Sequence, residues 1–301
     1  MNIALFFALD ICKSSYLPFF VQELIDAGVD TMAKCFKFGL DKHRDKKCIA
    51  TRKLLSEEDE VQPNGKVFKK WKMGEYTWNT FTEVDTLSSE FGRGLRELGQ
   101  MYKQNICIFA DTRAEWMVAA QACFKQTFPV VTLYTNLGEE AIAHAINLTE
   151  VEIVLTTHEL MPKFKTILSK TKKVNCIIYM EDQVNETDVT GYKKGVQIIS
   201  YKEVIAKGKH SQLHPTLPEP SDPAIIMFTS GSTGIPKGRV SQDSGTLSLI
   251  KLYCQVLSCL TRRLWPRCEH STLLLTQCAQ ETSTSATSPL PTSWSCSPKT
   301  R

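Results

Sequence analysis

The chain has 301 residues, enough for one large or two modest domains with a sizeable buried core. Its 42% hydrophobic and 23% charged residues are typical of a globular protein and exclude a disordered one. A formal net charge of +4 gives no case for a nucleic-acid partner. Six of the eleven cysteines lie in residues 1–240 without paired spacing, as buried thiols do in a reducing compartment.

The N-terminal stretch is apolar but too short to span a bilayer. Asp10 and Lys13 interrupt it well before the ~20 apolar residues that a membrane helix needs. It also lacks the basic start and the small-residue cleavage site of a signal peptide. The stretch from Tyr16 to Val21 is predicted to pack in the core, and a shallow peripheral membrane contact is the alternative.

The first elements are a helix and a small antiparallel unit. The helix is predicted at about Val21–Phe36, weakened by Gly28, and the charged residues 41–47 are predicted to form a solvated loop. Asn64-Gly65 is a hairpin turn signal. Short β-prone segments on either side of Met73-Gly74-Glu75 predict a small antiparallel element.

An amphipathic helix follows and ends near Gly99. Strands and helices then alternate, and continuous apolar strands joined by helices indicate a parallel sheet covered on both faces. The apolar residues of the amphipathic helix are Phe81, Val84, Leu87, Phe91, Leu95 and Leu98. The predicted strands are Asn105–Phe109, Pro129–Tyr134, Val151–Leu155, Val174–Met180 and Val196–Ile199. The predicted helices are Arg113–Lys125, Glu139–Asn147, Glu159–Leu168 and Tyr201–Ala206.

A polar, proline-rich linker over residues 208–223 leads to the most informative segment of the chain. There a buried-looking strand, Ala224–Phe228, runs directly into a loop of hydroxyls, glycines and one lysine, Thr229–Gly238. Ligand loops of α/β sheets normally follow the carboxyl ends of parallel strands. The loop is therefore expected where such a sheet binds its substrate.

This loop suits a polyphosphate, because glycines let backbone N–H groups approach oxygens while hydroxyls and a lysine add donors and charge. It is not a Walker A motif, since Gly238 follows the lysine where that motif has Ser or Thr. A flexible surface loop is the alternative, which the preceding strand disfavours. The candidate nucleotide-binding residues are Thr229, Ser230, Gly231, Ser232, Thr233, Gly234 and Lys237.

The loop resembles the phosphate-binding signature of acyl-adenylate-forming enzymes. Three further segments narrow the resemblance, which covers about residues 50–238, to the long-chain fatty-acid–CoA ligases of animals. The first segment is similar to the subgroup that includes arachidonate-preferring enzymes. The segments are Gln62-Pro63-Asn64-Gly65-Lys66-Val67-Phe68-Lys69-Lys70, Thr112-Arg113-Ala114-Glu115-Trp116-Met117 and Val131-Thr132-Leu133-Tyr134.

The resemblance implies an α/β fold, namely part of the adenylate-forming large domain. It implies that a long-chain fatty acid attacks ATP to give acyl-AMP, and that CoA then displaces AMP. Fixed donors and Mg²⁺ are expected to stabilise the charge of the first step. Lys237 would steady the β- and γ-phosphates, the loop's glycine backbones and hydroxyls would cradle them, and one threonine would reach the metal. The resemblance also implies the cytoplasmic face of the endoplasmic reticulum or another organelle membrane.

The resemblance stops after Gly238. Three domains are accordingly predicted: an N-terminal helical and loop segment (1–60), part of the AMP-binding domain (61–240) and a non-homologous, disordered tail (241–301). The tail contains twenty Ser or Thr and three acidic residues, and no periodic pattern persists in it beyond Leu260. Zinc binding by its cysteines is a weak alternative, because no second ligand pair follows Cys254 and Cys259.

The tail is interpreted as an out-of-frame reading of the family's own coding sequence. Reading the codons of Glu281–Cys296 one base early permits Asp-Val-Tyr-Ile-Gly-Tyr-Leu-Pro-Leu-Ala-His-Val-Leu-Glu-Leu, which resembles the next ligase segment. The chain would then lack the later nucleotide and metal motifs and the catalytic lysine of the family. No catalytic or metal-binding residue is therefore assigned, the sheet is expected to end on an unpaired strand edge, and this chain is expected to give no ligase turnover.

Sequencing the transcript across the codons of Lys237–Cys296 tests the frame interpretation. We expect the bases to spell the ligase-like segment in the frame that starts one base early. Codons whose third bases exclude that reading would contradict the interpretation.

Overall fold

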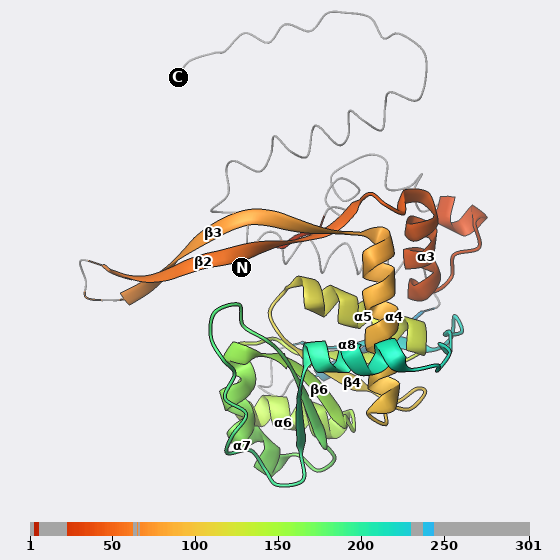
Figure 1. Ribbon diagram of the computed structural model, residues 1–301. Helices are drawn as coiled ribbons and strands as arrows, with labels where there is room; N and C mark the ends of the chain where they lie inside the picture. Colours follow the sequence, from red (N-terminus) through yellow and green to blue (C-terminus); the bar gives the residue numbers. More distant parts are fainter. Residues whose placement is uncertain (1–2, 6–22, 63–64, 66, 230–236, 244–301) are drawn as a thin grey trace, which may run out of the picture. The chain divides into compact units, whose positions relative to one another are not determined.

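The computed structural model describes residues 3–5, 23–62, 65, 67–229 and 237–243 (Figure 1). The chain divides into two units, residues 1–258 and 259–301, and every described residue lies in the first. Within the described residues, no helix is long and apolar enough to cross a membrane.

An antiparallel three-stranded sheet stands at the N-terminal end of the fold, in the order β1 (Ile3–Leu5), β2 (Lys47–Val61) and β3 (Val67–Thr80). β2 and β3 form one long hairpin whose strands join around Gly65, which has a φ of +76° as its turn requires. The turn prediction is confirmed. The predicted antiparallel element is larger than expected, because Met73-Gly74-Glu75 do not separate two strands but continue β3 through a register shift against β2.

The helix predicted at about Val21–Phe36 is divided in the structure. Gly28 adopts a φ of +66° after a short helical segment at residues 23–26, which interrupts the helix within its described part. Helix α3 (Met32–His43) begins instead at Thr31, whose side chain accepts a hydrogen bond from the N–H of Lys34. It continues through Asp41, so the solvated loop predicted there is wrong up to His43.

The second sheet has seven strands in the order β10-β9-β5-β4-β6-β7-β8. All neighbouring pairs are parallel except β9 and β10, which confirms the predicted mostly parallel α/β sheet. The strands are β4 (Ile106–Phe109), β5 (Val130–Thr132), β6 (Ile153–Thr157), β7 (Cys176–Met180), β8 (Gln197–Ser200), β9 (Pro223–Thr229) and β10 (Lys237–Gln242).

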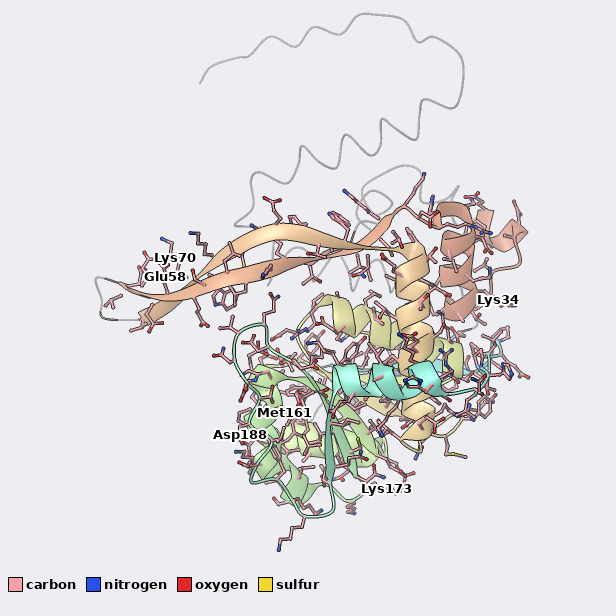
Figure 2. The ribbon with its side chains drawn as sticks, in the orientation of Figure 1. Lys34, Glu58, Lys70, Met161, Lys173 and Asp188 are labelled. Carbon is pink, nitrogen blue, oxygen red and sulfur yellow. The ribbon has the colours of Figure 1, made fainter. Side chains whose placement is uncertain are left out.

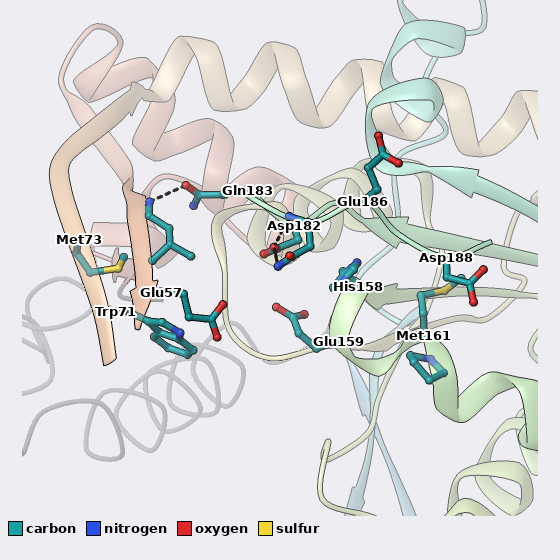
Figure 3. A pocket seen from close by; sticks show the side chains of 13 residues that line it. Glu57, Trp71, Met73, His158, Glu159, Met161, Asp182, Gln183, Glu186 and Asp188 are labelled. Atoms are coloured by element: carbon teal, nitrogen blue, oxygen red, sulfur yellow. Dashed lines mark hydrogen bonds between the residues drawn. The ribbon is translucent and has the colours of Figure 1, made fainter. Parts of the chain in front are cut away.

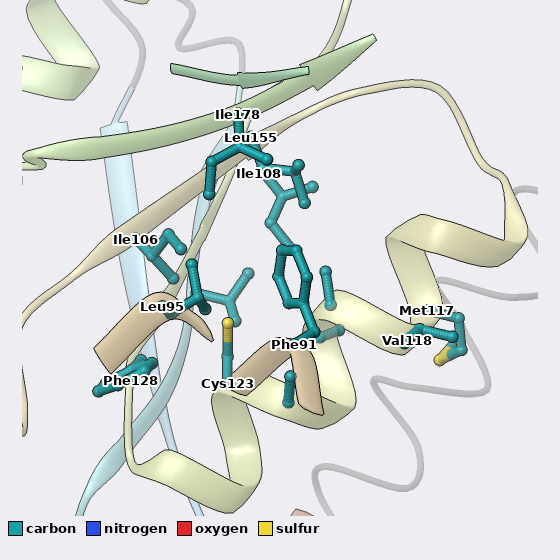
Figure 4. Packing of buried hydrophobic residues seen from close by; sticks show 14 of the residues in the cluster. Phe91, Leu95, Ile106, Ile108, Met117, Val118, Cys123, Phe128, Leu155 and Ile178 are labelled. Carbon is teal, nitrogen blue, oxygen red and sulfur yellow. The ribbon is translucent and has the colours of Figure 1, made fainter. Parts of the chain in front are cut away.

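Helices cover both faces of this sheet, as the apolar strands predict. One core packs α4, α5 and α8 against Ile106, Ile108 and Leu155 (Figure 4), and the other packs α6, η1 and α7 against Phe109 and Val154. Alternate residues of each strand thus enter different cores, since successive side chains point to opposite faces. The helices are α4 (Phe81–Glu97), α5 (Ala114–Gln126), α6 (Glu139–Leu148), η1 (His158–Lys163), α7 (Phe164–Lys170) and α8 (Tyr201–His210).

Two glycines set the spacing between α4 and α8. A Cβ atom at Gly94 would lie 2.0 Å from the backbone oxygen of Val204, and one at Gly208 would lie 1.7 Å from that of Glu90. No side chain fits at either position, so the two backbones are in direct contact. Capping boxes at Thr80–Glu83 and Ser200–Glu203 fix where both helices begin.

Gly208→Ala tests this close packing. We expect it to lower the free energy of unfolding by about 3 kcal/mol, because the new methyl group meets backbone rather than a side chain that can move. Lys202→Ala shortens an exposed side chain of the same helix to a methyl group and should change stability by less than about 0.5 kcal/mol. Urea unfolding measures both. Equal stability of the two variants would contradict the helix contact.

Candidate phosphate-binding site

Two paired strands frame the predicted phosphate loop. β9 ends at Thr229 and β10 begins at Lys237, and these two residues are Cα partners in the antiparallel pair. The other predicted binding residues, Ser230, Gly231, Ser232, Thr233 and Gly234, lie outside the described residues. The first and last residues of the predicted binding set therefore lie side by side, and the exposed Lys237 stands at the junction.

β9 delivers the loop to the carboxyl edge of the parallel sheet. It runs parallel to β5, with Met227 beside Thr132. The chain places β5 on one side of β4 and β6 on the other, which makes the carboxyl end of β4 a topological switch point. Open α/β sheets bind ligands in the crevice outside such points. The predicted phosphate loop begins at the end of β9, and only β5 lies between β9 and β4.

Gly238 fits closely against the strand that precedes the loop. A Cβ atom at this position would lie 3.0 Å from the ring atom Cζ of Phe228, its Cα partner in β9. The Phe228 ring is buried in the core beneath the sheet. A larger residue after Lys237 would press on this ring, which gives a structural reason for the glycine that ends the loop.

The end of β10 is anchored to the N-terminal part of the fold. Asp243 is buried, and its Oδ1 accepts a 3.0 Å hydrogen bond from the N–H of Met32 in the first turn of α3. Its own N–H donates to the backbone oxygen of Asp222, whose carboxylate pairs with Lys103 at 2.5 Å. β10 thus covers one edge of β9, so among the described residues the sheet ends on the antiparallel β10 rather than on the parallel β9.

A polar group that the sequence analysis did not single out lies at the same carboxyl edge. Thr135 follows β5 and donates from Oγ1 to Asp111 Oδ1 at 2.9 Å, and Asp111 follows β4. Lys163, at the end of η1, donates from Nζ to the backbone oxygen of Thr135 at 2.8 Å. For Asp111 and Thr135 the available signal was their position just after predicted strands, because the carboxyl ends of parallel strands share one edge. Lys163 lies in a predicted helix and had no such signal.

The segment Thr112–Met117, which carries part of the family resemblance, has a structural role at the carboxyl edge of the sheet. Arg113 is buried and forms a two-point ion pair with Glu115, with both N···O distances at 3.0 Å. Its Nη2 also donates to the backbone oxygen of Glu181 after β7. Burial opposes the charge, but the ion pair with Glu115 outweighs it and raises the pKa of Arg113. The motif therefore fixes the start of α5 to the segment after β7.

The described residues contain no group of three or more His, Cys, Asp and Glu side chains placed to hold a metal ion. The five cysteines described are all free, and burial raises the pKa of the Cys35 thiol to about 11, as expected for unreactive thiols. The cysteines weighed for zinc lie outside the described residues.

Comparison with known proteins identifies the family. The sequence profile described as "AMP-binding enzyme" matches residues 55–276, a span that includes the predicted loop and continues beyond it. The chain belongs to the AMP-binding enzyme family.

Curated relatives of the chain include long-chain acyl-CoA synthetases. Long chain acyl-CoA synthetase 8 of Arabidopsis thaliana is 36% identical over 222 residues, covering 72% of this chain and 31% of the relative. Long-chain-fatty-acid–CoA ligase 1 of Cavia porcellus is 34% identical over 180 residues, covering 58% of this chain and 26% of the relative. The chain thus spans about a third or less of the length of these two relatives.

Solved structures confirm the fold. The adenylation domain of a carboxylate reductase from Mycobacterium chelonae matches with a TM-score of 0.57 at 15% identity, over 71% of this chain and 34% of that one. The corresponding domain from Segniliparus rugosus, in complex with AMP and a co-purified carboxylic acid, also gives 0.57, at 16% identity, over 71% of this chain and 36% of that one. The architecture is that of an adenylate-forming domain.

The buried carboxyl of Asp243, which anchors the end of β10, should make the stability of the fold depend on pH. Burial, partly offset by the Met32 N–H bond, raises the pKa of its carboxyl to about 6 from an ordinary 3.8. The pKa of the Asp243 carboxyl is higher in the folded chain than in the unfolded chain. The stabilisation of the fold by protonated Asp243 is therefore complete below about pH 4 and is lost as the pH rises through about 6. Asp243→Asn keeps an oxygen acceptor but cannot ionise.

We expect Asp243→Asn to become more stable relative to the parent chain between about pH 4 and 7, by on the order of 2 kcal/mol. Urea unfolding at several pH values measures the difference. Asp45→Asn, at an exposed position, is the control and should follow the parent throughout. A constant difference between Asp243→Asn and the parent would contradict a buried, titrating Asp243.

Proposed function

We propose that the chain binds the phosphates of ATP as the nucleotide-binding part of a long-chain fatty-acid–CoA ligase. The reaction of the whole enzyme would activate the fatty acid as acyl-AMP and then transfer the acyl group to CoA. The single observation that supports this most is the pairing of Thr229 with Lys237 at the end of β9. Lys237 directly follows a glycine- and hydroxyl-rich connection, and the chain belongs to the AMP-binding enzyme family.

The chemistry of the proposed site is electrostatic. Lys237 would act as a point charge on the terminal phosphates, and the backbone N–H groups of Gly231 and Gly234 with the hydroxyls of Thr229, Ser230, Ser232 and Thr233 would donate to the remaining oxygens. Gly238 and Phe228 hold the strand junction from which Lys237 projects. Mg²⁺ bound with the nucleotide would share the charge of the phosphate oxygens.

The alternative is a chain that binds nucleotide or phosphate weakly without turning it over. Both hypotheses require the loop, so binding and turnover must be measured separately. Incubating the purified chain with ATP, Mg²⁺ and a long-chain fatty acid and assaying acyl-AMP decides between them: product supports an active ligase, and its absence supports binding alone.

Lys237→Ala tests the site itself. We expect the dissociation constant for ATP, measured by titration calorimetry, to rise about 10- to 100-fold, because a charge-assisted contact to phosphate is lost. Lys194→Ala removes an equally exposed lysine from the loop before β8 and should leave ATP affinity unchanged. Equal affinities of the two variants, or no ATP binding by the parent, would contradict the proposed site.

A further inference from the structure

β10 connects the proposed phosphate site to a second, buried contact at its far end. The strand carries Lys237 as its first residue, and Asp243 follows its last residue directly. Its register on β9 runs from Lys237 beside Thr229 to Gln242 beside Pro223. Whatever holds Asp243 in place therefore also fixes the strand that bears Lys237.

Asp243 makes this contact through its side chain and its backbone together. Its Oδ1 accepts the 3.0 Å bond from the N–H of Met32, a first-turn donor that has no acceptor within α3. Its own N–H donates to the backbone oxygen of Asp222 at 2.8 Å, directly before β9 begins. Asp243 is only 2% exposed, so water cannot replace a lost bond unless the contact opens.

The segment before β9 places a charged group near Asp243. Asp222 is buried, and Lys103 pairs with its carboxylate at 2.5 Å. Burial opposes the ionised form of Asp222, but the bonds from Lys103, the Glu219 N–H and Tyr102 outweigh burial and lower the pKa of Asp222. Asp222 is therefore negative at neutral pH and repels an ionised Asp243.

The segment before α3 contributes a second carboxylate. Asp30 pairs with Lys34 at 2.7 Å (Figure 2), and its charge also acts on Asp243. Burial, partly offset by the bond from Met32, raises the pKa of the Asp243 carboxyl to about 6, and the charges of Asp222 and Asp30 add to the increase. The carboxyl consequently changes its charge near pH 6, in surroundings that disfavour the ionised form.

We propose that Asp243 is a positioning residue for ATP binding, which couples the docking of β10 to a proton and thereby sets the affinity of the site at Lys237. The proposal rests on the proposed function, because it requires that Lys237 contacts the phosphates. Protonated Asp243 holds the end of β10 on α3, and ionisation weakens this contact, so the strand separates more often. The family resemblance ends at Gly238 and therefore does not imply this role.

The size of the coupling follows from the docked and released states of the strand. In the released state the pKa of the Asp243 carboxyl returns to its ordinary 3.8, whereas in the docked state it is about 6. Docking is therefore favoured about tenfold more at pH 5 than at pH 7.5. ATP would bind the docked strand, so its apparent affinity falls with the fraction of chains in which β10 is released.

Asp243→Ala and Asp243→Asn in the full 301-residue chain test the positioning role by titration calorimetry with ATP. Alanine removes the acceptor of the buried Met32 N–H, so we expect the dissociation constant at pH 5.5 to rise about tenfold. Asparagine supplies an oxygen acceptor again and should restore the affinity of the parent. Asp45→Ala, at an exposed position, is the control and should bind as the parent does.

The pH profile separates positioning from a merely structural role. Asparagine cannot ionise, so the dissociation constant of the parent should equal that of Asp243→Asn at pH 5 and exceed it several-fold, up to about tenfold, at pH 7.5. Protonation of ATP affects both chains alike and cancels in this ratio. Since Asp243→Asn retains the acceptor for Met32, this comparison holds even where Asp243→Ala fails to fold.

Amide hydrogen exchange without nucleotide reports on the strand itself. Protection of residues 238–242, relative to an unstructured peptide at the same pH, should fall about tenfold in the parent between pH 5 and pH 7.5 and stay constant in Asp243→Asn. Leu54 on β2 is the internal reference, because its N–H donates to Gln183 Oε1 at 2.8 Å (Figure 3) and neither group ionises.

Two results would overturn the proposal: unchanged ATP affinity in Asp243→Ala while the parent binds ATP, or a parent-to-Asp243→Asn ratio that stays constant with pH. Absence of ATP binding by the parent would overturn the proposed function and this role together. The exchange measurement needs no nucleotide, so it distinguishes a missing ATP site from a missing contact between Asp243 and α3.

Discussion

The antiparallel pairing of β9 with β10 is the constraint on which the proposed nucleotide site depends. It returns the chain beside the strand it has just left, so Thr229 and Lys237 become neighbours although seven residues separate them. Two contacts hold β10 in this place: Gly238 against the buried ring of Phe228, and the buried Asp243 on the first turn of α3. A flexible connection between unpaired strands would have to order its ends on binding, whereas here the ends are already positioned.

The parallel sheet places this junction at the edge where α/β proteins bind ligands, and two separate cores keep the sheet rigid. Backbone contact at Gly94 and Gly208 joins α4 to α8 on one face, while the two-point ion pair of Arg113 with Glu115 ties α5 to the segment after β7. The group formed by Asp111, Thr135 and Lys163 brings the ends of β4 and β5 and the end of η1 to one place. The proposed nucleotide site therefore adjoins strands that are packed on both faces of the sheet.

The sheet could be predicted from the sequence because its strands are short, continuous apolar runs, as Ile106–Phe109 and Cys176–Met180 illustrate. α3 was misplaced because a positive φ at Gly28 and a cap at Thr31 decided its start, and neither has a periodic pattern. The turn of the β2–β3 hairpin was predicted but its length was not, because its outer strands place charged residues such as Glu58 and Lys70 opposite each other instead of alternating apolar and polar residues. Contacts such as Asp243 with Met32 join residues 211 positions apart, and local sequence carries no signal for them.

Amide hydrogen exchange of residues 224–242, with and without saturating ATP, tests the central claim most directly, because it reports on the loop's own N–H groups. The account predicts that ATP slows exchange within residues 229–238 and leaves the β2–β3 hairpin unchanged. Unchanged exchange in that segment under conditions where ATP binds, or protection confined to another part of the chain, would contradict it.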